Sequence, residues 1–172
     1  EFYVVGYTYY KNENYSQAIS YFDAINLENN QFGQLSNYYL ADCYLRTNDP
    51  ASARIAFKNV SQMSYIPLMQ EEAAFNYAKL TAETGIEREA IQALENIKEA
   101  SPFYESSRDI LADVLERSGD LNFVFSVFER QKNLNVKMKI IYQSKLVEAG
   151  HKSYLEKNWK SAVNYYDRSL RY

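Results

Sequence analysis

Glycine and proline are scarce in this chain, with five and three residues among 172. An all-β protein needs many turns, and turns are rich in these two residue types, so their scarcity favours helices. No segment alternates convincingly between apolar and polar residues with a period of two, and we therefore predict no sheet. No apolar run approaches the roughly 18 residues that would indicate a membrane span.

Residues that carry chemistry are also scarce. The only cysteine, Cys43, cannot form an internal disulfide and does not identify the redox compartment. The only histidine, His151, excludes a histidine pair for zinc. The five glycines form neither a phosphate-binding loop nor a dinucleotide fingerprint. We predict no enzyme activity, no cofactor and no metal, with Cys43 a buried, inert thiol and His151 a partly exposed residue.

The charge balance argues against nucleic acid as a partner. The formal net charge is −3, and a nucleic-acid site needs a basic surface that displaces counterions. Hydrophobic residues at 47% and charged residues at 24% are typical of a folded domain. The chain starts at Glu1-Phe2-Tyr3 without a methionine, so we interpret it as a segment of a longer protein.

What the chain does contain is a repeat. A small residue is followed, twelve positions later, by another small residue, and a large residue comes four positions after that. The small pairs are Gly6 and Ala18, Ala41 and Ala53, Ala78 and Ala90, Ala112 and (less well) Val124, Gly150 and Ala162. The large residues are Phe22, Phe57, Leu94, Phe128 and Tyr166. Two packed helices need small side chains where their axes come closest, so each pair predicts one helical hairpin.

Turn residues fall between the members of each pair, as a hairpin requires. Examples are Asn12-Glu13-Asn14, Asn48-Asp49-Pro50 and Ser118-Gly119-Asp120. The predicted helices span 1–12, 15–27, 33–47, 50–63, 68–84, 87–99, 103–118, 121–133, 136–157 and 159–171. A hairpin of this kind cannot cover its own apolar face, so it must stack on a neighbour.

On these residues the chain resembles the tetratricopeptide repeat (TPR) family, which the five copies match over essentially the whole length. The resemblance implies an all-α, right-handed α-solenoid of about five hairpins and ten helices. It would be one domain, residues 1–172, with repeats at roughly 1–31, 32–66, 67–102, 103–135 and 136–172. Repeat four departs most, because Val124 replaces the usual alanine, and we expect a wider helix crossing or a local bend there. The tyrosine- and asparagine-rich style is similar to that of long bacterial multi-repeat proteins, some of them in the cell envelope.

In this family the first helices line a concave groove that binds partner segments. The positions that the resemblance assigns to the groove are Tyr3, Tyr7, Tyr10, Tyr38, Asp42, Phe75, Lys79, Asp109 and Asp113. The groove would be aromatic at its N-terminal end and acidic in the middle. A second interpretation stays open, in which these rings pack between helices or on a neighbouring repeat. Only Lys79 could serve in a carboxylate clamp, so we predict none.

Three functions follow as hypotheses. The first is a scaffold or adaptor that binds a protein or peptide in the groove. The second is a structural spacer, or a segment that self-associates through its open ends, since Val163, Tyr166 and Leu170 form an apolar stripe with nothing after it. The third is a glycan- or small-ligand-binding protein, which the short repeat spacing of 34 to 38 residues disfavours.

Overall fold

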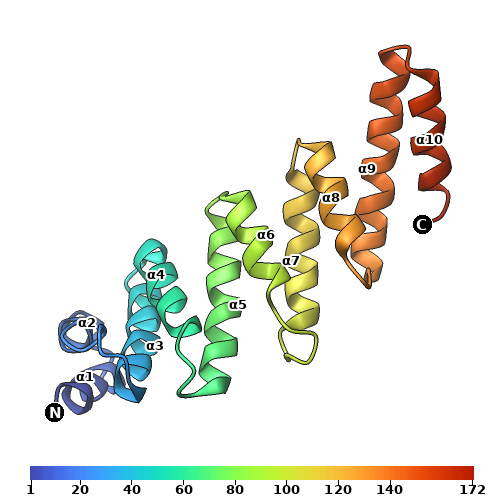
Figure 1. The fold of residues 1–172 in the computed structure, drawn as a ribbon. Coiled ribbons are helices and arrows are strands. Elements are labelled where there is room, and N and C mark those ends of the chain that lie inside the picture. The colour runs from blue at the N-terminus through green and yellow to red at the C-terminus, as the bar shows by residue number, and fades with distance from the viewer. The chain divides into compact units, whose positions relative to one another are not determined.

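A computed structural model describes all residues, 1–172, and contains helices but no strands. The all-α class and the ten predicted helices are confirmed (Figure 1). The helices are α1 Phe2–Lys11, α2 Tyr15–Asp23, α3 Gln31–Arg46, α4 Pro50–Ser61, α5 Pro67–Glu83, α6 Glu87–Glu95, α7 Tyr104–Arg117, α8 Leu121–Arg130, α9 Val136–Leu155 and α10 Trp159–Ser169. No helix is long and apolar enough to cross a membrane.

The chain divides into two compact units. The N-terminal unit, Glu1–Tyr104, holds the hairpins α1–α2, α3–α4 and α5–α6. The C-terminal unit, Glu105–Tyr172, holds α7 beyond its first residue and α8 to α10.

Short polar side chains begin most of the second helices. Asn14, Asp49, Asp120 and Asn158 each accept a hydrogen bond from a backbone N–H in the first turn of the helix that follows. These bonds satisfy donors that have no partner inside the helix, which is why the chain turns at these places. Glu13, Asn48 and Lys157 have left-handed backbone with φ near +60°, directly before the capping residue, and they close the tight turns of hairpins one, two and five.

Every second helix ends earlier than its apolar pattern predicted. The largest differences are in α2 and α6, which end four residues before the predicted positions 27 and 99. Beyond α2 the backbone continues in tighter turns, where Ile25 donates to the carbonyl of Phe22 and Glu28 donates to that of Ile25. The apolar side chains thus keep a helical spacing beyond the last helical residue, and spacing alone does not locate the end.

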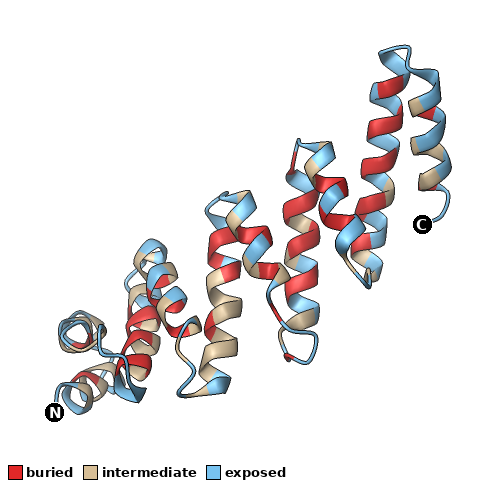
Figure 2. Cartoon of the chain, in the orientation of Figure 1, coloured by how far each residue is buried: buried red, intermediate tan, exposed pale blue.

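All ten small residues of the repeat pattern are buried. Figure 2 shows the buried positions of the helices in red. In the first hairpin, a Cβ added to Gly6 would lie 3.0 Å from ring atoms of Phe22. In the fifth hairpin, a Cβ added to Gly150 would lie 2.7 Å from the Tyr166 ring. At these two crossings the large residue of the repeat occupies the space that the glycine leaves.

Neighbouring hairpins share their cores. In the N-terminal unit, Ala18 and Phe22 of hairpin one form a buried cluster with Leu40 and Cys43 of hairpin two. A second cluster joins hairpin two to α5, the first helix of hairpin three. Its buried members are Ala41, Ala53, Ala56, Phe57, Val60, Ala73 and Leu80. Each hairpin in this unit therefore buries an apolar face against the next, as a stacked repeat requires.

Two buried amides hold the linkers between hairpins. The Gln34 side chain donates to the carbonyls of Met63 and Ile66 at 3.0 and 3.3 Å and accepts from the Ile66 N–H at 2.7 Å. Asn37 donates to the carbonyl of Asn26 at 2.6 Å. Both side chains are fully buried. They give hydrogen-bond partners to loop backbone that lies outside any helix.

In the C-terminal unit, aromatic contacts and side-chain hydrogen bonds join α8, α9 and α10. Phe128 of α8 stacks on Tyr142 of α9 with 4.6 Å between ring centroids. Arg168 of α10 donates to the Glu129 carboxylate at 2.6 Å and to the Tyr142 hydroxyl at 2.7 Å. The guanidinium thus connects three helices in one place.

Candidate functional site

Five tyrosines of hairpins one and two, which we call the tyrosine cluster, form a continuous group of rings. Its members are Tyr3, Tyr7, Tyr10, Tyr38 and Tyr39. Tyr39 lies at the centre, with ring centroids 5.1 Å from Tyr7 and 5.0 Å from Tyr10. Tyr38 stands perpendicular to Tyr39 at 5.7 Å. All five rings are half-buried, because they pack on the cores of these hairpins and still reach the surface.

Half-burial is compatible with both interpretations of the tyrosine stripe. Tyr3 and Tyr7 pack against the cluster around Phe22, and Tyr38 packs against the cluster around Phe57, so these rings contribute to the fold. Their exposed edges remain available to a partner. The sequence did not predict Tyr39 as a groove residue. Tyr39 follows Tyr38 directly, and adjacent helical residues point in different directions, so only Tyr38 was assigned to the groove.

A polar edge borders the rings. The Tyr10 hydroxyl donates to Asp42 Oδ2 at 2.8 Å, and Arg46 Nε lies 3.5 Å from the same oxygen. Burial raises the pKa of Tyr39 to about 12, and burial together with Asp42 raises the pKa of Tyr10. Burial and the neighbouring Glu72 carboxylate raise the pKa of Tyr38 as well. The hydroxyls are therefore neutral near pH 7 and act as hydrogen-bonding groups rather than as bases.

The other predicted groove residues have varied surroundings. Phe75 stacks on Phe103, with 5.0 Å between centroids and 14° between the ring planes, so one face of its ring is covered. Lys79 is exposed. In the C-terminal unit, Asp109 accepts a hydrogen bond from Asn135 at 2.8 Å, and Asp113 pairs with Lys137 at 2.6 Å. Both predicted acidic positions thus have partners at the start of α9, and the charge of Asp113 is matched.

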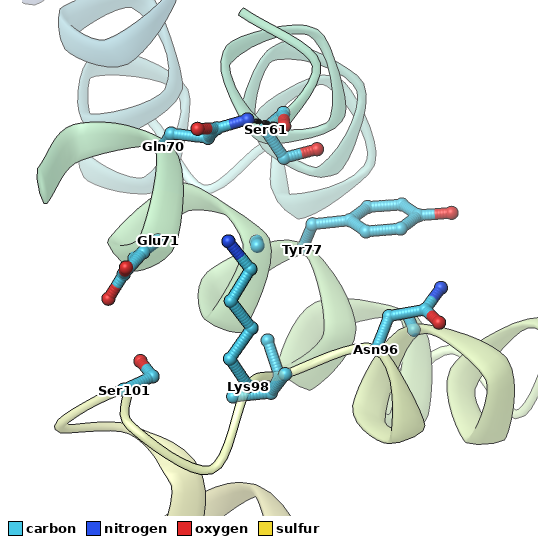
Figure 3. A pocket seen from close by; sticks show the side chains of 10 residues that line it. Ser61, Gln70, Glu71, Tyr77, Asn96, Lys98 and Ser101 are labelled. Atoms are coloured by element: carbon cyan, nitrogen blue, oxygen red, sulfur yellow. Dashed lines mark hydrogen bonds between the residues drawn. The ribbon is translucent and has the colours of Figure 1, made fainter. Parts of the chain in front are cut away.

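A concave feature lies beside α5 and α6, apart from the tyrosine cluster. It is a cavity of about 270 Å³, and its polar lining comes mainly from Gln70, Glu71, Tyr77, Asn96 and Lys98 (Figure 3). Gln70 is already engaged, because it donates to the Ser61 carbonyl at 3.1 Å. The volume is just below the usual range for small-molecule pockets. The lining offers one ammonium, one carboxylate and a few amides and hydroxyls, but no histidine or thiol.

Next to this cavity, Glu89 connects three helices. Its carboxylate accepts from the Tyr77 hydroxyl of α5 and pairs with Arg54 and Lys58 of α4 at 3.4 and 3.3 Å. The hydrogen bond from Tyr77 and the two cations hold the pKa of Glu89 below its ordinary value. A carboxylate with three donors already in place stabilises the helix packing and is not free to act as a base.

Cys43 and His151 lie in different environments. Cys43 is fully buried, and burial raises the pKa of its thiol to about 12, which disfavours the reactive thiolate. His151 is exposed on α9. No group of three or more histidine, cysteine, aspartate or glutamate residues is placed to hold a metal ion.

Comparison with known proteins finds structural similarity only. No family model and no curated protein matches the chain. Two crystal structures of nearly identical TPR-like repeats, from a Podosopora anserina protein named for kinesin light chain, are similar to it. One, a point variant, has a TM-score of 0.49 and 14% identity and covers 99% of this chain and 92% of that one. The other has a TM-score of 0.48 and 13% identity, with coverage of 98% and 93%.

Proposed function

We propose that this chain is a protein-interaction module that binds an extended segment of a partner across the tyrosine cluster. The observation that carries the proposal is the half-burial of five neighbouring rings with a carboxylate at their edge. Rings already fixed by their neighbours lose little conformational freedom when a partner binds, and tyrosine is enriched among the residues that dominate binding energy.

The chemistry of the surface favours a particular class of segment. Ring faces attract cations, and Asp42 and Glu72 lie beside Tyr10 and Tyr38. The N-terminal hairpin, residues 1–31, has four carboxylates and one lysine. A segment that carries arginine or lysine between apolar side chains would fit this surface.

Selection of peptides from a random display library on the folded chain tests the proposal. We expect the selected peptides to be rich in arginine or lysine beside apolar residues. Asp42→Asn should weaken their binding about 3- to 30-fold, because it removes a charged hydrogen-bond acceptor. Asp23→Asn on α2 is the matched control, since it removes the same charge from an exposed residue that is not part of the cluster, and it should change the affinity less than twofold.

Two outcomes would count against the proposal. If the library yields no binder above background, the tyrosine cluster is not a peptide-binding surface. Binders that lose equal affinity in both variants would show that overall charge is recognised rather than the tyrosine cluster.

A structural or self-assembling role is the second candidate. It is favoured by one observation, the exposure of large apolar side chains such as Phe2 of hairpin one and Val163 of hairpin five. This role does not exclude a binding surface on α1 and α3.

A further inference from the structure

The cavity beside α5 and α6, which we call the α5–α6 cavity, lies wholly within the N-terminal unit. Its lining residues run from Ser61 to Ser101, in the interior of the chain. They come from the end of α4, from α5, from α6 and from the linker after α6. Four segments of one compact unit therefore enclose this space.

Two alanines open the cavity. Ala74 lies four residues before Ala78, Ala93 lies three residues after Ala90, and both line the space. In every other hairpin at least one of the same two positions has a larger side chain. The pairs there are Phe2 and Tyr21, Asn37 and Ala56, Arg108 and Val127, and Leu146 and Tyr165. In hairpin one these two rings meet, with 6.3 Å between their centroids.

Hairpin two shows how an amide fills the same space. Asn37, at the position of Ala74, accepts a hydrogen bond from Asn59 at 3.2 Å and donates to the Asn26 carbonyl at 2.6 Å. Asn96 has the position of Asn59, because each lies six residues after the small residue of its helix. With alanine at position 74, the Asn96 side chain has no hydrogen-bond partner.

Two charged groups at the α5–α6 cavity also have no partner. Glu71 on α5 and Lys98 in the linker form no side-chain hydrogen bond or ion pair, either with each other or with another residue. In Figure 3 the Lys98 side chain extends from the linker into the space between Glu71 and Tyr77. The Tyr77 hydroxyl is already bound to Glu89. The unpaired groups of the lining are thus one carboxylate, one ammonium and one amide.

The linker that carries Lys98 is fixed before any ligand arrives. The Ser101 N–H donates to the Lys98 carbonyl at 2.9 Å, and the Tyr104 N–H donates to the Ser101 carbonyl at 3.0 Å. Ile97 and Ser101 are buried on either side of Lys98. A ligand therefore enters a preformed space, and little of its binding energy is lost in ordering the backbone.

We propose that the α5–α6 cavity binds a small zwitterion such as a free amino acid. The ligand's ammonium pairs with Glu71, its carboxylate pairs with Lys98, and Asn96 can donate to or accept from either group. A ligand with a single charge would leave the opposite charge of the cavity unmatched. The volume of about 270 Å³ limits the ligand to a small molecule. This role goes beyond peptide binding, because it uses none of the tyrosine cluster.

A nuclear magnetic resonance titration of the isotope-labelled chain tests the proposal. Each uncharged natural amino acid is added separately, up to about 10 mM. We expect at least one to bind with a dissociation constant of about 1 mM or tighter and to shift the amides of Glu71, Tyr77 and residues 96–101. The amine that lacks its carboxylate, and the acid that lacks its amino group, should each bind about tenfold more weakly or worse.

Variants of the lining locate the site. Glu71→Gln and Lys98→Met should each weaken binding of the amino acid about tenfold or more, without changing the melting temperature, because neither side chain has a partner in the fold. Ala74→Asn, which introduces the amide that hairpin two has there, should abolish binding. Glu83→Gln and Lys79→Met are the controls. They remove the same charges from exposed residues of α5 outside the lining and should change the affinity less than about twofold.

Three results would overturn the proposal. If no uncharged amino acid shifts the lining amides by about 10 mM, the α5–α6 cavity is not a site for this class of ligand. If the amine or the acid binds as tightly as the amino acid, a single charge is recognised and not the zwitterion. If Glu71→Gln and Lys98→Met both bind as the unaltered chain does, the amino acid binds elsewhere.

Discussion

Replacing Gly33 with alanine probes the packing between the first two hairpins. Gly33 is buried in the first turn of α3, and an added Cβ would lie 1.8 Å from the carbonyl oxygen of Glu28. This neighbour is backbone, so no side-chain rotation can relieve the clash. Carbon and oxygen need roughly 3.5 Å when they are not bonded, so the linker must move by about 1.5 Å.

The free energy of unfolding should fall despite the better helix propensity of alanine. Alanine gains about 1 kcal/mol over glycine inside a helix. Overpacking a rigid site typically costs about 1–3 kcal/mol and sometimes more. The shift would also disturb the cap in which Asn30 accepts from the Gly33 N–H at 2.9 Å, which is worth about 1 kcal/mol. The net loss is about 1–3 kcal/mol.

Thermal unfolding followed by circular dichroism measures this change. A loss of about 1–3 kcal/mol lowers the melting temperature by roughly 3–10 °C in a chain of this size. Gly119→Ala is the control, because a Cβ there meets nothing within 4 Å and the backbone is not left-handed, so its effect should stay within about 0.5 kcal/mol. A Gly33→Ala protein that melts at or above the temperature of the unaltered chain would refute the reasoning.

Three further predictions test other parts of the structure. Gln34→Ala should lower the free energy of unfolding by about 1–3 kcal/mol in urea titrations, because it leaves the Ile66 N–H and the Met63 carbonyl without the amide that pairs with them, while the Ile66 carbonyl keeps the Gln70 N–H; a smaller loss would show that water replaces the amide. Gly150→Ala should destabilise the fifth hairpin, since the new Cβ would lie 2.7 Å from Tyr166, and hydrogen exchange should quicken in α9 and α10; unchanged exchange would argue against a tight crossing. Stability should fall as pH rises from about 10 to about 12, because the unfolded chain loses the Tyr39 proton near pH 10 while the folded chain keeps it to about 12, and Tyr39→Phe should flatten this slope.

Most of the fold could be predicted from the sequence, because the repeat fixes both helices of every hairpin. The predicted first residues of the helices agree with the observed ones to within two residues. These predictions came from the small pairs, such as Ala41 and Ala53, and from the turn residues between them. The ends of α2 and α6 could not be predicted, because Ile25 and Ile97 continue the apolar spacing after the backbone has left the helix.

The burial of the Gln34 and Asn37 side chains could not be predicted from the sequence either. A glutamine or asparagine in a helix usually faces water, so nothing in the local pattern sets Gln34 and Asn37 apart. Their role depends on loops about 30 and 11 residues away, at Met63 to Ile66 and at Asn26. Such a contact is tertiary, and a single sequence carries no direct signal of it.

The candidate binding surface was predicted only in part. The stripe of Tyr3, Tyr7 and Tyr10 could be read from helical spacing, but spacing does not say how far each ring is buried. The partners of Asp109 and Asp113 lie at the start of α9, so the acidic character expected for the middle repeats could not be judged without coordinates.

The most direct test of the proposed function is to locate a bound peptide by nuclear magnetic resonance. A peptide selected on the folded chain would be titrated into isotope-labelled protein, and shifts of amides and tyrosine rings would be followed. We expect the largest changes to fall on α1 and α3, around Tyr10, Tyr39 and Asp42. Changes confined to the cavity beside α5 and α6, or to residues 136–172, would contradict it.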